Sequence, residues 1–474
     1  MGKGNETGLK SFIKGSAVLF ISNIIIKGIQ FFLLPLYTNE LTPEMLGVSD
    51  AVTTMTGFVF PVLVMGLDSA FSAFYFEEEE NQQDKVFSSI TLLLGIMGFL
   101  PVAACLFSGK ISEILFQTPD NSYVVMIALL SVTANLLYLP LSLEVRLQNK
   151  MFAYSVVAVV SSAAIVIFNV LFLCCFHLGI YALILSTFIV NILQIILFAV
   201  AVKKKFSVKF VDKNLVKRML LYSLPMLPSV LSTLILTLSD RYIILYYQGE
   251  QAVGIYGIGT RFVAILSVVI SSVSTAYTTF AYSSYKKPEA KEQFSVVLSI
   301  VYVLMIGIAF IISIFSKEII SLMAAPEYLT AYKALPDMMF AQVLYTLYTL
   351  TCYGVLFEKK SGYILFSTLA AAVVNLVLNI MFIPHYGIVA AAFTTLIGYA
   401  IMLFINFYNA QRLYPCPYGM KRILLHFLGL YFVVRTLSEQ SFAIKLGITF
   451  LCAAFTLLIY RKNAIMLVAQ SWQV

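Results

Sequence analysis

Three basic residues interrupt long apolar stretches of this sequence: Lys27, Arg241 and Arg261. A charge at the centre of a membrane-spanning helix costs about 2.5–3.5 kcal/mol on insertion scales, so such a side chain is expected to face a polar cavity or a charged partner. Lys and Arg satisfy phosphate oxygens through charge-assisted hydrogen bonds. These residues therefore predict a cavity for an anionic group. The alternatives are structural ion pairs, of Lys27 with a carboxylate such as Asp68 and of Arg241 with the adjacent Asp240.

Lys27 lies near the middle of the apolar stretch 15–37, too deep for its side chain to reach the membrane surface easily. Asn23, Lys27 and Gln30 are separated by four and three residues, so they share one face of a helix. This spacing predicts a polar stripe on an otherwise apolar helix. We expect Asn23 and Gln30 to line the substrate cavity together with Lys27.

Two acidic residues, Asp68 and Asp240, lie in or at the ends of the apolar stretches. Asp68 follows Gly66 near the end of the second apolar stretch, and Asp240 directly precedes Arg241. A carboxylate inside a membrane protein is a candidate for taking up a proton or a cation during transport. Asp68 and Asp240 are therefore candidate sites for coupling to H⁺ or Na⁺. For Asp68, a solvated position at a helix end or an ion pair with Lys27 is an equally good interpretation.

Groupings typical of catalysis are missing from the sequence. Its three histidines, His177, His385 and His426, form no metal-binding spacing, and no glycine-rich phosphate loop stands out. The six cysteines lie mostly inside apolar stretches without metal-ligand spacing. We therefore expect no catalytic residue, no metal site and no cofactor.

The composition sets the class of protein. Of 474 residues, 60% are hydrophobic and only 11% are charged, against about 25% charged residues in soluble domains. Each membrane-spanning helix needs about 20 apolar residues, and the apolar content suffices for about fourteen such helices. The sequence thus predicts an all-α polytopic membrane protein, and it excludes large soluble domains and surfaces for nucleic acid.

The apolar stretches, bounded by charges, Pro or Gly, predict fourteen helices. The first six cover residues 15–37, 47–75, 86–108, 123–143, 154–176 and 180–202. The next six cover residues 220–247, 251–282, 294–315, 332–357, 362–384 and 387–409, and the last two cover residues 420–437 and 442–460.

The basic residues predict the orientation of these helices. With the N-terminus on the cytoplasmic side, 23 of the 31 Lys and Arg residues fall in cytoplasmic loops, 5 fall in outer loops, and the remaining 3 lie within helices. Cytoplasmic loops of membrane proteins are enriched in Lys and Arg. We therefore expect both termini in the cytoplasm, and the net charge of +8 reports topology rather than substrate.

Two landmarks recur at nearly the same spacing. His177 and His385, each two residues before a glycine, lie 208 residues apart, and Gly47 and Gly254 lie 207 residues apart. These offsets predict two parallel six-helix repeats related by an axis along the membrane normal. The expected division is an N-lobe of residues 1–205, a C-lobe of residues 206–411 and two C-terminal helices in residues 412–474.

With these landmarks, the sequence resembles the polysaccharide and O-antigen type flippases of the multidrug/oligosaccharidyl-lipid/polysaccharide flippase superfamily. The resemblance covers nearly the whole chain. It rests on five patches in order: Gly66-Leu67-Asp68 to Phe74-Tyr75; Arg146-Leu147-Gln148-Asn149-Lys150; Leu224-Pro225-Met226-Leu227-Pro228-Ser229; Ser239-Asp240-Arg241-Tyr242 to Gly254-Ile255-Tyr256; and Asn375 to Asn379 with Ile383 to Ala391.

The resemblance implies two six-helix bundles in a V shape, followed by two further helices. It implies that an undecaprenyl-diphosphate-linked oligosaccharide moves from the cytoplasmic to the outer leaflet of a bacterial cell membrane, through a cationic central cavity to which Lys27 and Arg261 can be matched by helix. Implied partners are this lipid-linked oligosaccharide, membrane lipids, a polysaccharide polymerase and a chain-length regulator. The chain departs from many relatives at Ala73, where they carry an Arg.

Two other functions stay open. A cation-coupled multidrug exporter of the same superfamily needs acidic residues facing its cavity, whereas the charge inside the expected helices is net basic. A membrane polysaccharide polymerase or acyltransferase is a different class, and a polymerase usually needs a larger outer loop than the longest expected here, residues 109–122.

Overall fold

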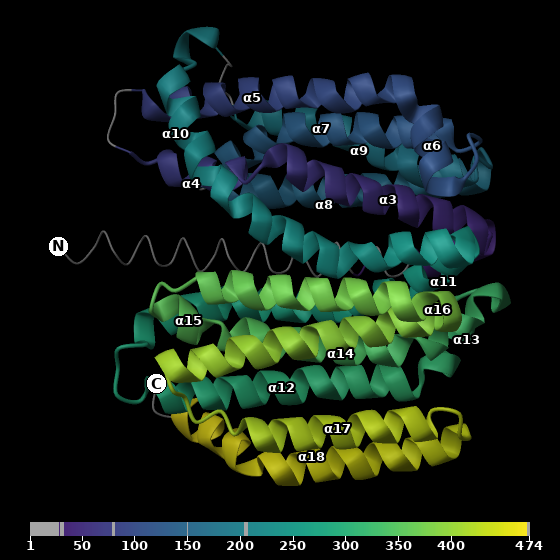
Figure 1. Cartoon of the computed structure of the whole chain (residues 1–474), viewed down its shortest axis with the longest axis vertical. Coiled ribbons are helices and arrows are strands. Elements are labelled where there is room, and N and C mark those ends of the chain that lie inside the picture. Colours follow the sequence, from purple (N-terminus) through teal and green to yellow (C-terminus); the bar gives the residue numbers. More distant parts are fainter. Residues whose placement is uncertain (1–27, 29–32, 78–80, 149, 203–206, 472–474) are drawn as a thin grey trace. The chain divides into compact units, whose positions relative to one another are not determined.

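The computed structural model describes residues 28, 33–77, 81–148, 150–202 and 207–471. Within these ranges the regular structure is helical throughout, with no β-strand (Figure 1). Backbone groups have no water to bond in hydrocarbon, and helices satisfy them internally. The prediction of an all-α polytopic membrane protein is confirmed.

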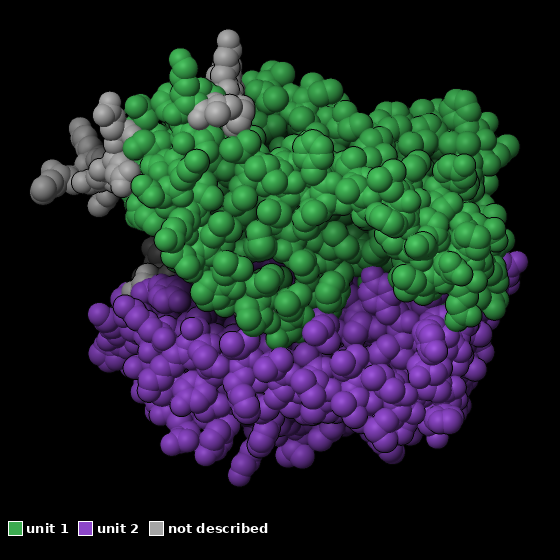
Figure 2. All heavy atoms as spheres, turned by 45° about the horizontal axis from the view of Figure 1, so that its top comes forward, with its two compact units in different colours: residues 1–234, 249–254 green, residues 235–248, 255–474 purple. Residues whose placement is uncertain are grey.

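The chain divides into two compact units, coloured in Figure 2. Unit 1 comprises residues 1–234 and 249–254, and unit 2 comprises residues 235–248 and 255–474. The division of the sequence into residues 1–205, 206–411 and 412–474 stays a prediction.

Unit 1 contains the helices up to the beginning of α11. Within it, α7 lies between α5 and α9, and the short helix α10 packs on α4 and α5. Their bounds are α2 Leu34–Glu40, α3 Pro43–Val64, α4 Leu67–Phe74, α5 Gln82–Ala104, α6 Ser108–Phe116, α7 Ser122–Leu147, α8 Met151–Val170, α9 Ile180–Val202 and α10 Lys213–Ser223.

Unit 2 contains most of α11 and all the helices after it. α14 packs on α12 and α16, while α17 and α18 lie side by side next to α12 (Figure 1). The bounds are α11 Leu227–Ser284, α12 Ala290–Ile314, α13 Ser316–Met323, α14 Leu335–Thr351, α15 Tyr353–Phe357, α16 Gly362–Leu413, α17 Met420–Leu437 and α18 Phe442–Ser471.

Ten described segments are long and apolar enough to cross a membrane. Two of them, Val230–Ser274 and Gly362–Leu413, contain 45 and 52 residues, about twice what one crossing needs. Both are interrupted by a glycine with non-helical backbone angles, Gly249 and Gly387. The structure thus breaks the chain between residues 247 and 251 and between residues 384 and 387, as expected, while the total of fourteen helices stays a prediction.

Side-chain contacts show that α11 and α16 fold back on themselves at these glycines. The hydroxyl of Tyr256 donates to Asp240, 16 residues earlier, and the hydroxyl of Thr394 donates to Asn379, 15 residues earlier. In a continuous helix such residues would lie more than about 20 Å apart. Each element is therefore a helical hairpin.

The expected single helix over residues 47–75 is wrong. α3 ends at Val64 and α4 begins at Leu67, because Met65 and Gly66 both adopt left-handed backbone angles, with φ of 50° and 73°. Glycine adopts this conformation without steric cost. The N–H of Met65 bonds to the carbonyl of Pro61, which closes the last turn of α3.

The glycines of the two landmarks that precede the sixth and twelfth expected helices share a positive φ. Gly179 and Gly387 both have positive φ, 53° and 57°, and a helical segment follows each. Since these residues are 208 positions apart, the backbone supports the internal repeat at this point.

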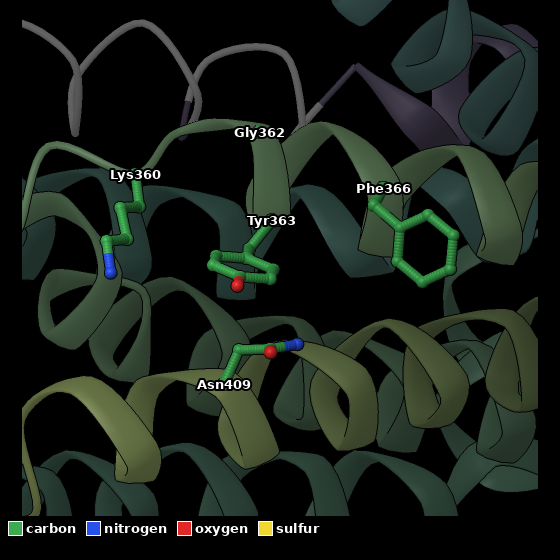
Figure 3. Close-up of a pocket in the computed structure, with 5 residues that line it drawn as sticks. All are labelled: Lys360, Gly362, Tyr363, Phe366 and Asn409. Atoms are coloured by element: carbon green, nitrogen blue, oxygen red, sulfur yellow. The ribbon is translucent and has the colours of Figure 1, made fainter.

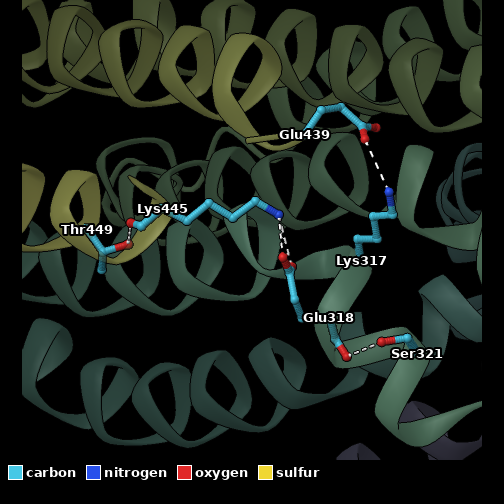
Figure 4. A network of polar contacts seen from close by, with 6 residues as sticks. All are labelled: Lys317, Glu318, Ser321, Glu439, Lys445 and Thr449. Atoms are coloured by element: carbon cyan, nitrogen blue, oxygen red, sulfur yellow. Dashed lines mark hydrogen bonds and ion pairs between the residues drawn. The ribbon is translucent and has the colours of Figure 1, made fainter. Parts of the chain in front are cut away.

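Two ion pairs attach the C-terminal helix α18 and the turn before it to α13 (Figure 4). The ammonium of Lys445, only 1% exposed, bonds both carboxylate oxygens of Glu318, at 2.7 and 3.0 Å. Lys317 lies 3.6 Å from Glu439, and both of these side chains are about half exposed. A hydrogen bond from the Tyr332 hydroxyl lowers the pKa of the Glu439 carboxyl, and the positive charge of Lys317 lowers it further.

We expect the two pairs to differ in their contribution to stability. Lys445→Ala removes a buried ammonium and leaves the Glu318 carboxylate, about one-third exposed, without its cation. It should lower the free energy of unfolding by about 1.5–3 kcal/mol, the range for hydrogen bonds to charged groups. The matched change Lys317→Ala should cost less than about 0.5 kcal/mol. Denaturant unfolding of both variants in one detergent checks this, and equal losses would contradict it.

Candidate functional site: a buried polar layer in unit 2

The sequence-predicted residues of the first apolar stretch, Asn23, Lys27 and Gln30, lie outside the described residues. Asp68 is exposed in the first turn of α4, in unit 1. Its position follows from the break at residues 65 and 66, which separates it from α3. Roles for these four residues stay predictions.

The α11 hairpin positions Asp240 and Arg241. Asp240 is 5% exposed. One of its carboxylate oxygens accepts from the hydroxyl of Tyr256, and the other accepts from the backbone N–H of Arg241 at 2.8 Å. A buried carboxylate requires hydrogen-bond donors, and the hairpin supplies them from both of its halves.

Arg261 lies on the second half of the same hairpin and is partly exposed. It is five residues beyond Tyr256, which places it about 7 Å further from the turn at Gly249. Five residues also rotate a helical side chain by about 140°. The hairpin therefore carries Arg241 and Arg261 at different depths, and Arg261 does not share the face on which Tyr256 meets Asp240.

The α16 hairpin contributes buried amides and a hydroxyl. Asn375 and Asn379 are fully buried one turn apart, and the Nδ2 of Asn379 donates to the Oδ1 of Asn375 at 3.1 Å. Thr394 donates to Asn379 from the second half. The Nδ2 of Asn375 has no hydrogen-bond partner among the described residues. In the sequence the pair is two asparagines four residues apart in an apolar stretch, a spacing that places them on one helix face but does not by itself predict a role.

The first half of α11 runs alongside the first half of α16. A methyl group placed on Gly398 would lie 3.0 Å from Leu236 and 3.3 Å from Asn375, so these three residues meet. Further along, the side chain of Gln248 donates to the carbonyls of residues 383 and 384, at 3.5 and 3.4 Å. The two helical segments are therefore parallel and in contact at both ends.

This alignment sets the level of Asp240. Asp240 is one turn beyond Leu236, and Asn379 is one turn beyond Asn375 in the same direction. From this end Asp240 is level with Asn379. Counting back from Gln248, which meets residues 383 and 384, instead places Asp240 level with Asn375. Asp240 therefore lies between the levels of Asn375 and Asn379 within unit 2. One carboxylate, two carboxamides and the hydroxyls of Tyr256 and Thr394 together form a buried polar layer inside an apolar bundle.

The chemistry of this layer suits a small hard cation or a proton. Carboxylate, amide and hydroxyl oxygens are the ligands that hard cations prefer, and a single carboxylate balances a single positive charge. No cluster of three or more His, Cys, Asp or Glu side chains that could hold a metal occurs in the part of the chain that the structure describes. The layer therefore does not resemble a site for a tightly held divalent metal.

A second feature of unit 2 is a surface groove of about 590 Å³ at the beginning of α16. It is lined by Lys360, Gly362, Tyr363, Phe366 and Asn409. In Figure 3 Tyr363 lies between Lys360 and Phe366, and Asn409 faces them from the second half of α16. The groove thus combines one ammonium group with aromatic surface.

Two family models match this chain. The model described as polysaccharide biosynthesis protein matches residues 12–281, more than half of the chain. The model described as MatE matches residues 225–381. An uncharacterized membrane protein of Methanocaldococcus jannaschii is 25% identical over 454 residues, covering 89% of this chain and 88% of the relative.

Solved structures share the fold. The lipid II flippase MurJ, in an inward closed conformation, is similar with a TM-score of 0.77 and 18% identity, covering 95% of this chain and 99% of that chain. A multidrug resistance MATE family transporter in an outward-facing conformation has a TM-score of 0.64 and 15% identity, covering 84% and 95%. A transporter of Pyrococcus furiosus from the same superfamily has a TM-score of 0.63 at 15% identity, with coverage of 84% and 95%.

These matches agree with the helical, multi-pass architecture and with the absence of a catalytic grouping in the sequence. The chain therefore belongs to the polysaccharide biosynthesis protein family, and it shares its fold with a lipid II flippase and with multidrug transporters.

Proposed function

We propose that this protein moves undecaprenyl-diphosphate-linked oligosaccharide repeat units from the cytoplasmic to the outer leaflet of a bacterial cytoplasmic membrane. The product would feed the synthesis of O-antigen, capsule or exopolysaccharide. The observation that carries the proposal is the family match over residues 12–281, which includes the membrane-embedded basic residues Arg241 and Arg261.

The chemistry of the substrate explains why basic residues would be kept in the membrane. A diphosphate cannot enter hydrocarbon without compensating charge, and guanidinium groups supply paired N–H donors with a matching geometry. Lys27, Arg241 and Arg261, with Asn23 and Gln30, would form the cationic cavity, which alternating access exposes to one leaflet and then to the other. With both termini in the cytoplasm, a negative-inside potential favours outward movement of an anion by about 2.3 kcal/mol per charge per 100 mV.

The Lys360 groove offers complementary chemistry at the surface of unit 2. An ammonium next to Tyr363 and Phe366 matches an amphiphile at the junction between its phosphate and its isoprenoid chain. Phe366 is 60% exposed, so apolar contact is available directly beside the charge. We propose that this groove receives the lipid-linked substrate before transport.

The buried polar layer supports ion coupling. Asp240 would bind H⁺ or Na⁺, with the amide and hydroxyl oxygens of Asn375, Asn379 and Thr394 completing the site. Asp68 is the weaker candidate because its side chain is exposed and no buried polar partner is described for it. The layer lies on the two hairpins of unit 2, so ion binding would act on the element that carries Arg241 and Arg261.

A second candidate function is cation-coupled export of drugs. The match to the MatE model over residues 225–381 favours it, as does similarity to MATE transporters. Cationic drugs require carboxylates that are available to them. Asp240 shares its hairpin with two basic residues, Arg241 and Arg261, which favours an anionic substrate over a cationic drug.

Reconstituted vesicles test the proposed transport directly. Wild-type protein should make lipid-linked oligosaccharide on the far leaflet accessible to an added lectin. Lys27→Ala and Arg261→Ala should each slow this by about tenfold or more, because one charge-assisted contact contributes about 1.5–3 kcal/mol. The matched variant Lys110→Ala, changed in an exposed residue of α6, should retain the wild-type rate.

Unchanged lectin accessibility with folded wild-type protein would refute the flippase proposal. Efflux of a cationic dye from the same vesicles would favour the drug exporter instead. Full activity of both Lys27→Ala and Arg261→Ala would refute the cationic cavity while leaving the flippase activity intact.

Ion coupling is tested by Asp240→Asn. The amide retains a hydrogen-bond acceptor for Tyr256 but loses the negative charge, so an imposed H⁺ or Na⁺ gradient should no longer accelerate transport. Asp120→Asn, an exposed residue between α6 and α7, serves as control and should respond to the gradient as wild type does. If transport by Asp240→Asn still responds fully to the gradient and transport by Asp68→Asn does not, the coupling site is Asp68 rather than Asp240.

A further inference from the structure

Two short helices, one in each unit, occupy equivalent positions of the repeat. α6 begins at Ser108, and α13 begins 208 residues later at Ser316, the same offset as between the two histidine landmarks. α6 follows α5 through a short 3₁₀ helix at Cys105–Phe107, and α13 follows α12 after one residue, Phe315. Since α5 and α12 are candidate membrane spans, each short helix lies at the end of a span (Figure 1).

The apolar residues of the two helices match position by position. Each helix has three apolar residues with the spacing i, i+3 and i+4, which places them on one face. They are Ile111, Ile114 and Leu115 in α6, and Ile319, Leu322 and Met323 in α13. In both helices the middle residue is exposed and the other two are partly buried. Ile114 is 80% exposed and Leu322 is 86% exposed.

The opposite side of each helix packs on its own unit. Ser112 and Ile320, two residues before the exposed ones, are fully buried, and two residues correspond to a rotation of about 200° around a helix. α6 packs on α7, and α13 packs on the 3₁₀ helix Pro326–Lys333. Ile114 and Leu322 therefore point away from the units that carry them.

A polar side completes each helix. Lys110 and Glu113 are exposed on α6, and Lys317 and Ser321 are exposed on α13. Lys110 lies one turn before Ile114, and its side chain is long enough to keep its ammonium in water. A helix with separate polar and apolar sides lies in the plane of a membrane surface, with its apolar face about 5–10 Å into the boundary between headgroups and acyl chains.

The exposed apolar side chains continue the lipid-facing surface of the adjoining spans. Phe99 on α5 is 74% exposed, Leu106 directly after α5 is 86% exposed, and Ile311 on α12 is 49% exposed. A single exposed apolar residue is ordinary on a protein surface, but the same position is apolar and exposed in both repeats. A partner protein would have to present one contact to two different units, whereas a bilayer meets the end of every span in the same way.

We propose that α6 and α13 are a repeated pair of interfacial helices that bind the phospholipid surface. Ile114 and Leu322 insert where the headgroups meet the acyl chains, and each unit thus has its own contact that sets its depth in the bilayer. The distribution of basic residues predicts that this surface is the outer one. The inference rests on the multi-pass architecture and is independent of which substrate is moved.

Tryptophan fluorescence tests the lipid contact without any transport assay. Trp472 is the only tryptophan of the chain, so Trp472→Phe provides a background without tryptophan. Ile114→Trp and Leu322→Trp each add one ring at a mostly exposed position, where it displaces no packed side chain. In vesicles of phosphatidylglycerol and phosphatidylcholine, we expect phosphatidylcholine brominated near the upper end of its acyl chains to quench both fluorophores.

Glu113→Trp and Ser321→Trp are the matched controls. Both residues are exposed and directly precede Ile114 and Leu322, on the polar side of each helix. The preference of tryptophan itself for membrane surfaces is common to all four variants. Aqueous iodide on both sides of the bilayer should quench the two controls at least about threefold more strongly than Ile114→Trp and Leu322→Trp, because an inserted face is shielded from water.

Equal iodide quenching within each pair, or no quenching of Ile114→Trp and Leu322→Trp by the brominated lipid, would overturn the proposal. Shielding of these two positions from both quenchers would also overturn it, since that result indicates a protein contact. Lipid contact at only one of the two helices would refute the repeated pair. If a tryptophan variant fails to fold, nitroxide-labelled cysteines at the same four positions, with the six native cysteines replaced by serine, give the same comparison. Relaxation of the nitroxide by oxygen then reports lipid, and relaxation by an aqueous nickel complex reports water.

None of these measurements uses lipid-linked oligosaccharide. Failure of the flippase proposal would therefore be seen separately, in the lectin assay.

Discussion

The constraint on which the structure depends is that backbone N–H and C=O groups in hydrocarbon must find partners within the chain. Helices meet this requirement, so departures from helical geometry are confined to positions that tolerate them. In the described spans these include the left-handed turn at Gly66 and the positive-φ breaks at Gly179, Gly249 and Gly387. Each break redirects the chain, and two of them create the hairpins α11 and α16 that position the candidate site.

The same constraint acts on buried side chains. Asp240, Asn375, Asn379 and Thr394 lie in an apolar bundle. Hydrogen bonds link Asn375, Asn379 and Thr394 to one another and link Asp240 to Tyr256 on the other half of its hairpin. A polar group without a partner in such a place destabilises the fold. Because apolar residues would pack there at lower cost, this burial is one reason why we propose a functional role for the polar layer inside unit 2.

Much of the architecture was predictable because apolar length and charge bias report membrane crossing directly. The interruptions near residues 249 and 387 agree with predicted helix ends, and the repeat offsets marked Gly47, Gly254, Gly179 and Gly387. The break at Gly66 was not predicted, because the apolar composition of a stretch gives no information on its backbone angles. Local sequence also placed Asp240 beside Arg241, but it carried no information on Tyr256 or Asn379, which lie 16 and 139 residues away.

The sequence by itself thus determined the membrane class, the approximate helices, the repeated spacing of its landmarks and the basic residues that the helices must accommodate. These properties depend on hydrophobicity and spacing, which are local and additive along the chain. Tertiary structure alone decided which polar groups share a layer and which halves of the hairpins lie side by side. Those outcomes depend on how the hairpins pack. Packing brings together residues that are far apart in the sequence, so their contacts cannot be read from local patterns.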